Sequence, residues 1–333
     1  MNISRKETVK RAVHFQNPAY IPLRYTASDD KADVIIVPVE RHFMGPDNNN
    51  SEWGFTWHRV NQDLAMGTPV ESLIKTWDDL KNIKIPDAND PERFSEFKQI
   101  KEKYGDDRYY IADLVLTGFT IATFLREFDK VMEDLCLERE NIEKLLDIIF
   151  DFENSLVPLI AAQGFDCINF ADDWGTQQDT IISRDMFVEI FKPRYAKQFR
   201  LIHDYGMDVY FHCCGMVYPF IQDFIDMGID ILNLGQPTIN GIEKVGTEFA
   251  GKVCFAFPVS YQSTGVSGTR EQIFQEVRDI VKYCNTPKGG LIGLVLERMT
   301  LLGGSPDQSV YIREAFETYC GPKNLLDNTG LGK

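Results

Sequence analysis

The sequence lacks the signatures of several common protein classes. It contains neither GxGxxG nor GxxxxGK[ST], the glycine-rich loops that cradle nucleotide phosphates, which disfavours a nucleotide-binding fold. Its longest apolar runs, such as 34–39 and 291–296, are far too short to span a bilayer. Basic residues are scarce, with 35 Lys and Arg against 50 Asp and Glu and a formal net charge of −15. Because nucleic-acid binders need a basic face, we expect no nucleic-acid partner.

A disulfide framework is also missing. The seven cysteines are odd in number and scattered, and most are expected to be small buried hydrophobic residues. The N-terminus has no apolar signal-peptide core and is typical of the start of an amphipathic helix. We therefore expect a cytoplasmic protein with no membrane association. A hydrophobic content of 44% over 333 residues is ordinary for a soluble protein with a large core.

Short apolar runs alternate with amphipathic stretches along most of the chain. The runs have roughly the four to seven residues of a typical strand, and near-continuous apolar strands alternating with helices indicate a parallel sheet covered by helices. The expected strands are 109–115, 167–170, 208–212, 229–234, 253–257 and 290–296, and the expected helices include 141–163, 185–205, 218–227, 270–283 and 308–319. Their number and spacing favour a closed (β/α)8 TIM barrel.

The first hundred residues are less regular. A helix is expected over 4–14, extended segments over 21–25 and 33–39, and a hairpin near 52–58. We expect one domain over 1–333, in which 1–105 forms an N-terminal extension that lids the barrel mouth. Residues 106–322 are expected to form the main barrel repeats.

Chemistry in a β/α barrel is concentrated where the strands end. His212 and Cys214 lie two positions apart at such an end, and strand alternation points them to the same side. Imidazole and thiolate suit Zn²⁺, and Glu297, after the run 290–296, could complete three protein ligands and leave a fourth position for substrate. The sequence therefore predicts a catalytic zinc at His212, Cys214 and Glu297, with Cys213 pointing into the wall. The alternatives are a hydrogen-bonded core histidine and a Glu297 that pairs with Arg298 or a lysine.

Further polar residues follow other predicted strands. Of the adjacent Asp172 and Asp173, only one can face the pocket readily, and Asp173 is the better candidate for substrate contact or general acid catalysis. Helix capping is the alternative for this acidic pair. Asn233 and Gln236 could orient a ligand, or they could only bond the loop backbone.

Aromatic residues could form an apolar wall for a substrate. Trp174 follows Asp173 directly, and Tyr25, Trp53 and Trp57 belong to the segment expected to cover the barrel mouth. Packing in the core is the default alternative for such residues.

Taken together, these motifs resemble the uroporphyrinogen decarboxylase superfamily and, within it, the zinc-dependent, corrinoid-linked methyltransferases. The resemblance extends over nearly the whole chain and includes 4–7 with 21–22, 52–54, 116–120, 172–175, 192–194, 212–215, 228–233 and 289–290. Decarboxylases of the superfamily carry an Arg-Gln-Ala-Gly-Arg-Tyr segment near the N-terminus, where this chain offers only Arg24. The methyltransferases show His-x-Cys-Gly and a later cysteine that ends the last strand. His212 and Cys214 match this pattern, while Glu297 replaces the later cysteine and would favour oxygen donors over thiols.

The resemblance implies a zinc enzyme that moves a methyl group between a small molecule and the cobalt of a corrinoid (cobalamin) carried by a partner protein. The aromatic residues favour an aromatic methyl ether as the donor, which would make the chain an O-demethylase component. Three alternatives stay open, namely methyl transfer from the corrinoid protein to a thiol, decarboxylation of a uroporphyrinogen-type substrate, and a non-catalytic binding barrel. The sequence also leaves open a homo-oligomer.

Overall fold

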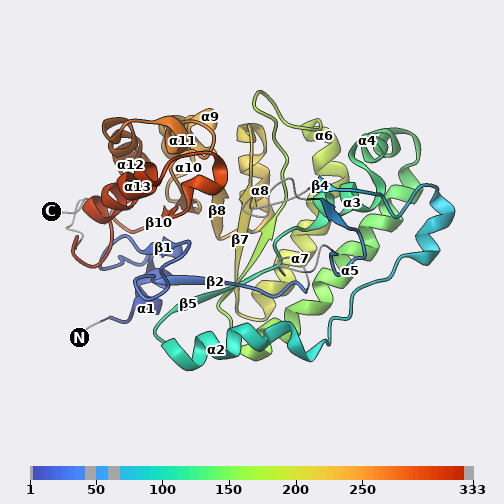
Figure 1. Ribbon diagram of the computed structural model, residues 1–333, viewed down its shortest axis with the longest axis horizontal. Coiled ribbons are helices and arrows are strands. Elements are labelled where there is room, and N and C mark those ends of the chain that lie inside the picture. The colour runs from blue at the N-terminus through green and yellow to red at the C-terminus, as the bar shows by residue number, and fades with distance from the viewer. Residues whose placement is uncertain (1–2, 42–49, 59–67, 326–333) are drawn as a thin grey trace.

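Eight parallel strands close into a barrel in the computed structural model, which describes residues 3–41, 50–58 and 68–325 (Figure 1). The order around the barrel is β1-β10-β9-β8-β7-β6-β5-β2. The barrel strands are β1 (Leu23–Tyr25), β2 (Val34–Pro38), β5 (Tyr109–Asp113), β6 (Cys167–Ala171), β7 (Asp208–Cys213), β8 (Ile231–Leu234), β9 (Cys254–Phe257) and β10 (Leu291–Val295). The predicted (β/α)8 barrel is confirmed.

Two of the eight barrel strands come from the first hundred residues. Strands β1 and β2 pair with each other and with β10 and β5, so the barrel begins well before the expected boundary at residue 106. Between β2 and β5 the described chain adds a short antiparallel ribbon of β3 (Trp57–His58) and β4 (Thr68–Pro69), two 3-10 turns and helix α2 (Ser95–Tyr104). The segment 1–105 therefore contributes β1 and β2 to the barrel itself.

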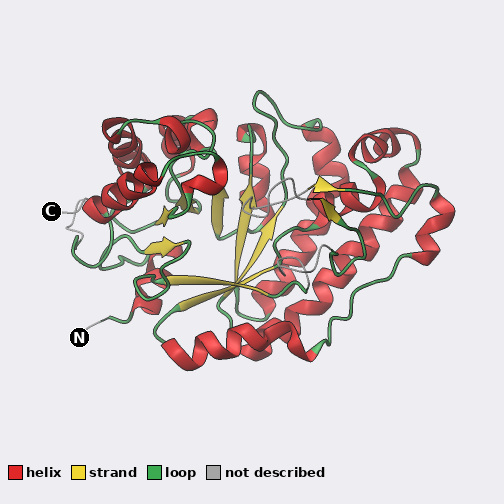
Figure 2. Cartoon of the chain, in the orientation of Figure 1, coloured by secondary structure: helices red, strands yellow, loops and turns green. Residues whose placement is uncertain are grey.

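Helices surround the barrel on its outer side (Figure 2). The α-helices are α1 (Arg5–Val13), α2 (Ser95–Tyr104), α3 (Gly118–Arg126), α4 (Phe128–Leu137), α5 (Arg139–Gln163), α6 (Arg184–Met186), α7 (Lys192–Asp204), α8 (Ile221–Met227), α9 (Pro237–Asn240), α10 (Ile242–Phe249), α11 (Thr264–Ser267), α12 (Arg270–Cys284) and α13 (Pro306–Tyr319). A π-helical turn, Phe187–Phe191, joins α6 to α7, and short 3-10 turns span Trp77–Asn82, Pro91–Phe94, Tyr218–Phe220 and Met299–Leu302. None of the helices in the described ranges is long and apolar enough to cross a membrane.

Helix α1 closes the N-terminal end of the barrel. Its Val9 and Val13 pack in one cluster with inward-facing strand residues such as Tyr109, Cys167 and Ile231. The chain then approaches β10 so closely that a Cβ on Gly290, whose φ is +104°, would lie 2.5 Å from the Phe15 ring. Only glycine fits there, which explains the glycines before the last strand.

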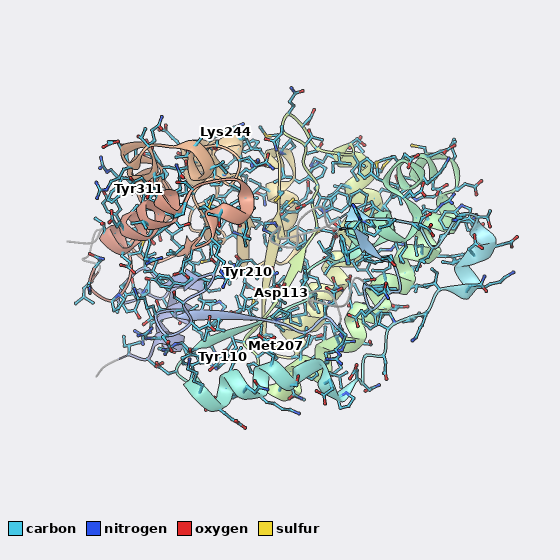
Figure 3. The ribbon with its side chains drawn as sticks, viewed as in Figure 1. Tyr110, Asp113, Met207, Tyr210, Lys244 and Tyr311 are labelled. Carbon is cyan, nitrogen blue, oxygen red and sulfur yellow. The ribbon has the colours of Figure 1, made fainter. Side chains whose placement is uncertain are left out.

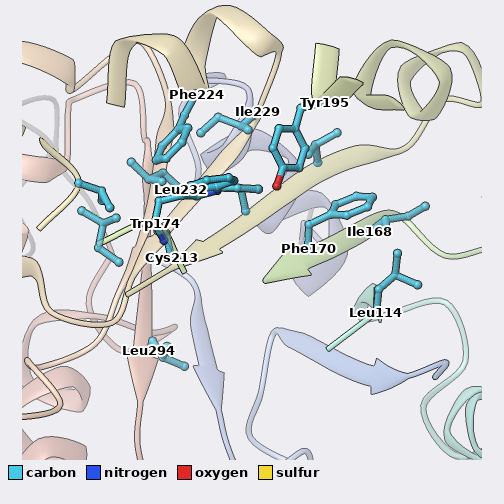
Figure 4. Packing of buried hydrophobic residues seen from close by; sticks show 14 of the residues in the cluster. Leu114, Ile168, Phe170, Trp174, Tyr195, Cys213, Phe224, Ile229, Leu232 and Leu294 are labelled. Carbon is cyan, nitrogen blue, oxygen red and sulfur yellow. The ribbon is translucent and has the colours of Figure 1, made fainter. Parts of the chain in front are cut away.

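The wall between the barrel and its helices forms the larger apolar core (Figure 4). Phe170, Cys213, Leu232 and Trp174 are buried in this layer, on the outer side of β6, β7 and β8. The opposite faces of the same strands point inward, and Tyr210 lies with Asp113 near the centre of the molecule (Figure 3). Because strand side chains alternate, neighbouring positions along a strand face either the helices outside the barrel or the barrel interior.

Candidate metal centre

Strands β6 and β7 carry the polar residues of the candidate site on their inward faces. Cys167 and Tyr210 belong to the cluster inside the barrel, and Ala171 pairs with His212 across the two strands. Continuing the alternation by two residues brings Asp173 and Cys214 to the same side as His212. The carboxyl end of the barrel therefore presents an imidazole, a thiol and a carboxylate together.

Asp173, His212 and Cys214 form a compact group. Each offers a ligand atom within 4.8 Å of the other two. His212 Nε2 lies 3.4 Å from Cys214 Sγ and 3.9 Å from Asp173 Oδ1. The side chain of His212 is 20% exposed and that of Asp173 is 51% exposed, so the group opens to the barrel mouth. The sequence predicted two of these three residues as ligands and the third, Asp173, as a substrate contact or acid.

Asn233 on β8 fixes the orientation of the His212 ring. Its Oδ1 lies 2.6 Å from His212 Nδ1, and its amide nitrogen donates a hydrogen bond to the carbonyl of Ala256. Because the amide nitrogen is used in this way, the oxygen faces the ring and Nδ1 carries the proton. The lone pair of Nε2 then points toward Cys214 and Asp173, as a metal ligand requires.

Close backbone contact holds the two loops of the site together. Cys214 N donates to Asp173 Oδ1 at 2.8 Å. A Cβ on Gly175 would lie 2.6 Å from the Gly215 carbonyl carbon, and Gly215 itself has a φ of +82°. The loops after β6 and β7 can therefore touch only because both positions are glycine.

The electrostatics of the group call for a cation. Burial and the neighbouring Asp173 carboxylate raise the pKa of the Cys214 thiol well above its usual value. A divalent ion would reverse this effect by stabilising the thiolate as a ligand. Three protein ligands of these types suit zinc and leave a position for a further ligand, so the residues fit such an ion.

Comparison with known proteins identifies the family. A family model described as uroporphyrinogen decarboxylase (URO-D) matches residues 62–293, well over half of the chain. The chain belongs to the URO-D family. A search of curated proteins finds no match to the chain.

One solved structure shares the architecture of this URO-D family member. A methyltransferase from Methanosarcina mazei shares 15% sequence identity and has a TM-score of 0.74, covering 95% of this chain and 99% of that one. Native xylanase 10B from Thermotoga maritima, 12% identical, covers 95% of this chain and 98% of its own with a TM-score of only 0.44. At these identities the likeness concerns the fold.

Glu297 is not part of the group that His212 and Cys214 form. Its carboxylate accepts hydrogen bonds from Ala27 N at 2.7 Å and from Ser28 Oγ at 2.6 Å, and it lies 3.8 Å from Arg313. Ile292 of β10 belongs to the inward cluster, and Glu297, at a position of opposite parity, is turned toward the loop after β1. The structure places Asp173, and not Glu297, beside His212 and Cys214.

The aromatic residues predicted as a substrate wall lie elsewhere. Tyr25 points outward and donates to Glu317 on α13 at 3.0 Å. Trp53 is buried edge-on against Phe152 of α5, with ring centroids 5.2 Å apart. Trp174 is fully buried on the outer side of the barrel wall, among the phenylalanines Phe119, Phe187, Phe191 and Phe220. Trp57 is likewise buried, against Phe55 and Phe124. For these residues the core alternative describes the structure.

Asp172 and Gln236 support the loops around the site. Asp172 is fully buried at the N-terminus of α3, where it accepts hydrogen bonds from Phe119 N at 3.0 Å and Thr120 N at 2.7 Å. Burial raises the pKa of Asp172 to about 7. Gln236 Oε1 accepts from Gly215 N at 3.2 Å, so this side chain holds the backbone just after Cys214. Both residues follow the structural alternatives that the sequence left open.

Sequence reasoning did not assign a role to three residues near the centre. Arg24 lies in register with the inward-facing Val34, and its Nη1 donates to the Tyr210 hydroxyl at 3.4 Å. A Cβ on Gly235 would lie 2.9 Å from both Cys214 Sγ and the Tyr261 ring, so Tyr261 flanks the thiol. Alternation along β1 and β7 could have placed Arg24 and Tyr210 inside the barrel. Tyr261 lies in a loop with no such periodic signal.

Proposed function

We propose that this chain is a zinc-dependent methyltransferase that moves a methyl group from a small methyl donor to the cobalt of a corrinoid carried by a partner protein. The group of Asp173, His212 and Cys214, with His212 oriented by Asn233, is the observation that carries the proposal. These three residues would hold the ion in place of the predicted set with Glu297. The M. mazei methyltransferase, similar over nearly the full length of both chains, supports the reaction type.

The proposed reaction needs an acid at the oxygen of the donor. Methyl transfer breaks the bond between that oxygen and the methyl carbon, while the reduced cobalt supplies the electron pair of the new bond. The departing oxygen gains negative charge, and zinc, when bound, stabilises such charge as a Lewis acid. The chain would hold the ion with the carboxylate of Asp173, the imidazole of His212 and the thiolate of Cys214. Asn233 keeps the imidazole in the ligating tautomer, and the mouth-facing side remains open for the donor.

The ligand types favour an oxygen donor over a thiol. A carboxylate as third ligand makes the ion harder than a second cysteine would, and harder sites prefer oxygen. We therefore retain a methyl ether as the preferred donor. Its aromatic part would meet Tyr210 and Tyr261, since the tryptophans are packed in the core. Transfer from the corrinoid protein to a thiol remains the second candidate.

Arg24 argues against a porphyrinogen substrate. Among the described residues it makes no ion pair within 4.0 Å, and it donates a hydrogen bond to the neutral hydroxyl of Tyr210. Burial raises the pKa of Tyr210 to about 12, so this hydroxyl stays protonated at neutral pH. One inward arginine can recognise one anionic group but not the many carboxylates of a porphyrinogen.

Metal analysis of purified protein tests the proposal first. We expect about one zinc per chain at this centre, lost in His212→Ala and Cys214→Ser but kept in Cys213→Ser. Cys213 is the matched control, because its buried sulfur faces the core, where it accepts a hydrogen bond from Trp174 N at 3.3 Å and donates one to Cys214 O at 3.5 Å. Asp173→Ala should lose zinc and Glu297→Gln should keep it. The opposite result for this last pair would restore the ligand set predicted from the sequence.

Activity is then measured with the zinc-loaded protein, a Co(I) corrinoid protein and a panel of donors. The panel contains methoxyaromatics with and without a carboxylate, and the reverse assay offers thiols to the methylated corrinoid. Methylcobalt formation from an ether supports the proposal, while methylation of thiols alone favours the second candidate. Activity toward neither, with a zinc-free protein, would leave a non-catalytic barrel.

A further inference from the structure

We propose that the N-terminal face of the barrel binds a second divalent metal ion through His14, Asp208 and Asp230. Each of these residues offers a ligand atom within 4.8 Å of the other two. His14 follows the last residue of α1, Asp208 is the first residue of β7, and Asp230 immediately precedes β8. This face lies at the opposite end of β7 from Cys214, so the second site is separate from the proposed catalytic centre.

The spacing of the donor atoms suits one shared ion. His14 Nε2 lies 3.1 Å from Asp208 Oδ1. Two ligand atoms on a tetrahedral ion, with bonds of about 2.0–2.2 Å, stand about 3.3 Å apart. The second carboxylate, Asp230, also lies 2.8 Å from the Nε2 of His203, which places a second imidazole beside the group. Carboxylates combined with imidazole are typical ligands of zinc and of similar divalent transition metals.

Both carboxylates are held in place by further hydrogen bonds. The second oxygen of Asp208 accepts a hydrogen bond from the Tyr109 hydroxyl inside the barrel. Asp230 Oδ2 accepts from Val209 N at 2.8 Å. Contacts of this kind orient metal ligands and limit their freedom before an ion arrives.

The charged residues on this face favour a cation between Asp208 and Asp230. The neighbouring Asp166 is paired with two lysines, Lys6 at 2.8 Å and Lys10 at 3.3 Å. Within the described part of the chain, the ion pairs of Asp208 and Asp230 involve histidines alone. Hydrogen bonds to Asp208 and Asp230 raise the pKa of His14 and of His203, respectively, so the two carboxylates favour a positive charge at this position. A divalent ion bound here would take the place of the proton on His14 and supply that charge. Such an ion would fasten α1 to the floor of the barrel.

Zinc titration of a chain without the central site tests the proposal. The double variant His212→Ala, Cys214→Ser is freed of metal with a chelator and titrated with Zn²⁺. The heat released and the unfolding temperature are measured. We expect one ion per chain and an unfolding temperature raised by about 5 °C at 100-fold excess over Kd. Adding Asp208→Asn, which keeps the shape and an acceptor for Tyr109, should abolish both effects. Adding His58→Ala, an exposed histidine on β3, should change neither.

Three outcomes separate this proposal from the proposed function. If the double variant binds no zinc, or if Asp208→Asn does not reduce its binding, the second site is refuted and the residues form ion pairs only. A parent chain that binds two ions, one lost with His212 and one with Asp208, supports both proposals. A parent ion that is lost with Asp208→Asn but retained in the double variant would support this site and refute the central one.

Discussion

Asn233 gives the sharpest test of how the candidate metal centre is organised. Its Oδ1 sits 2.6 Å from His212 Nδ1 and is itself buried, so no water can easily replace it. In Asn233→Ala the ring loses its partner, and both orientation and tautomer become free. Loss of such a partner lowers metal affinity by about 10- to 100-fold, or about 1.4–2.8 kcal/mol.

The assay is a competition titration with a chromophoric zinc chelator, which gives Kd directly. The half-buried Asn141→Ala on α5, far along the sequence from the site, is the matched control and should leave Kd unchanged. Cobalt substitution provides a second measurement, because the absorption band of a cobalt–thiolate bond reports whether Cys214 still coordinates. A Kd for Asn233→Ala within twofold of the parent would show that the imidazole is not the ligand or is fixed by something else. In that case the argument from His212 orientation fails.

Three further perturbations follow from the structure. Burial raises the pKa of Glu153 from 4.5 to about 8, so the folded chain binds the extra proton and stability falls as pH rises between these values. In urea unfolding at several pH values, Glu153→Gln should reduce this pH dependence of the unfolding free energy by up to about 1.4 kcal/mol per pH unit. Gln198 can reverse its amide and keep the hydrogen bond to residue 153. An unchanged pH dependence would contradict the raised pKa of Glu153. Gly215→Ala should lower zinc binding and should reduce the free energy of unfolding by more than the about 1–3 kcal/mol expected for a non-glycine residue with left-handed backbone angles. Gly206→Ala, with φ +74° and nothing within 4 Å of the added Cβ, should show only this backbone cost. Arg24→Met should lower kcat/KM about 10- to 100-fold for donors that carry a carboxylate and leave neutral donors unaffected.

Most of the fold could be predicted because the strands are apolar runs with clear boundaries. Each expected run overlaps an observed strand to within two residues at either end, as with 208–212 and β7 (Asp208–Cys213). Helices α3 and α4 were not named among the expected helices, although α4 buries Val131, Asp134 and Leu135 at helical spacing. The early strands β1 and β2 were anticipated as extended segments but were not assigned to the barrel. Closure of a sheet by short strands is a tertiary property with little local signal.

The parts of the candidate site that depend on local strand geometry could be predicted, and those that depend on contacts between distant segments could not. His212 and Cys214 could be placed on one side because strand alternation is local and strict. The same alternation, applied to β10 and β1, would have turned Glu297 and Tyr25 away from the interior. The approach of Asp173 to Cys214 depends on the contact between Gly175 and Gly215, two loops separated by a helix. No periodic pattern in the sequence encodes such a contact.

The three groups that could grip an ion come from two adjacent strands, while Arg24, on β1, and Tyr261, after β9, approach from elsewhere around the ring. Under the proposed function, the residues that would hold the ion and the residues that would contact the donor come from different parts of the barrel. Substitutions in the loops after β1, β9 and β10 could then change the preferred donor without lowering the affinity for the ion. A fold organised in this way can diversify its substrates while its reaction stays the same.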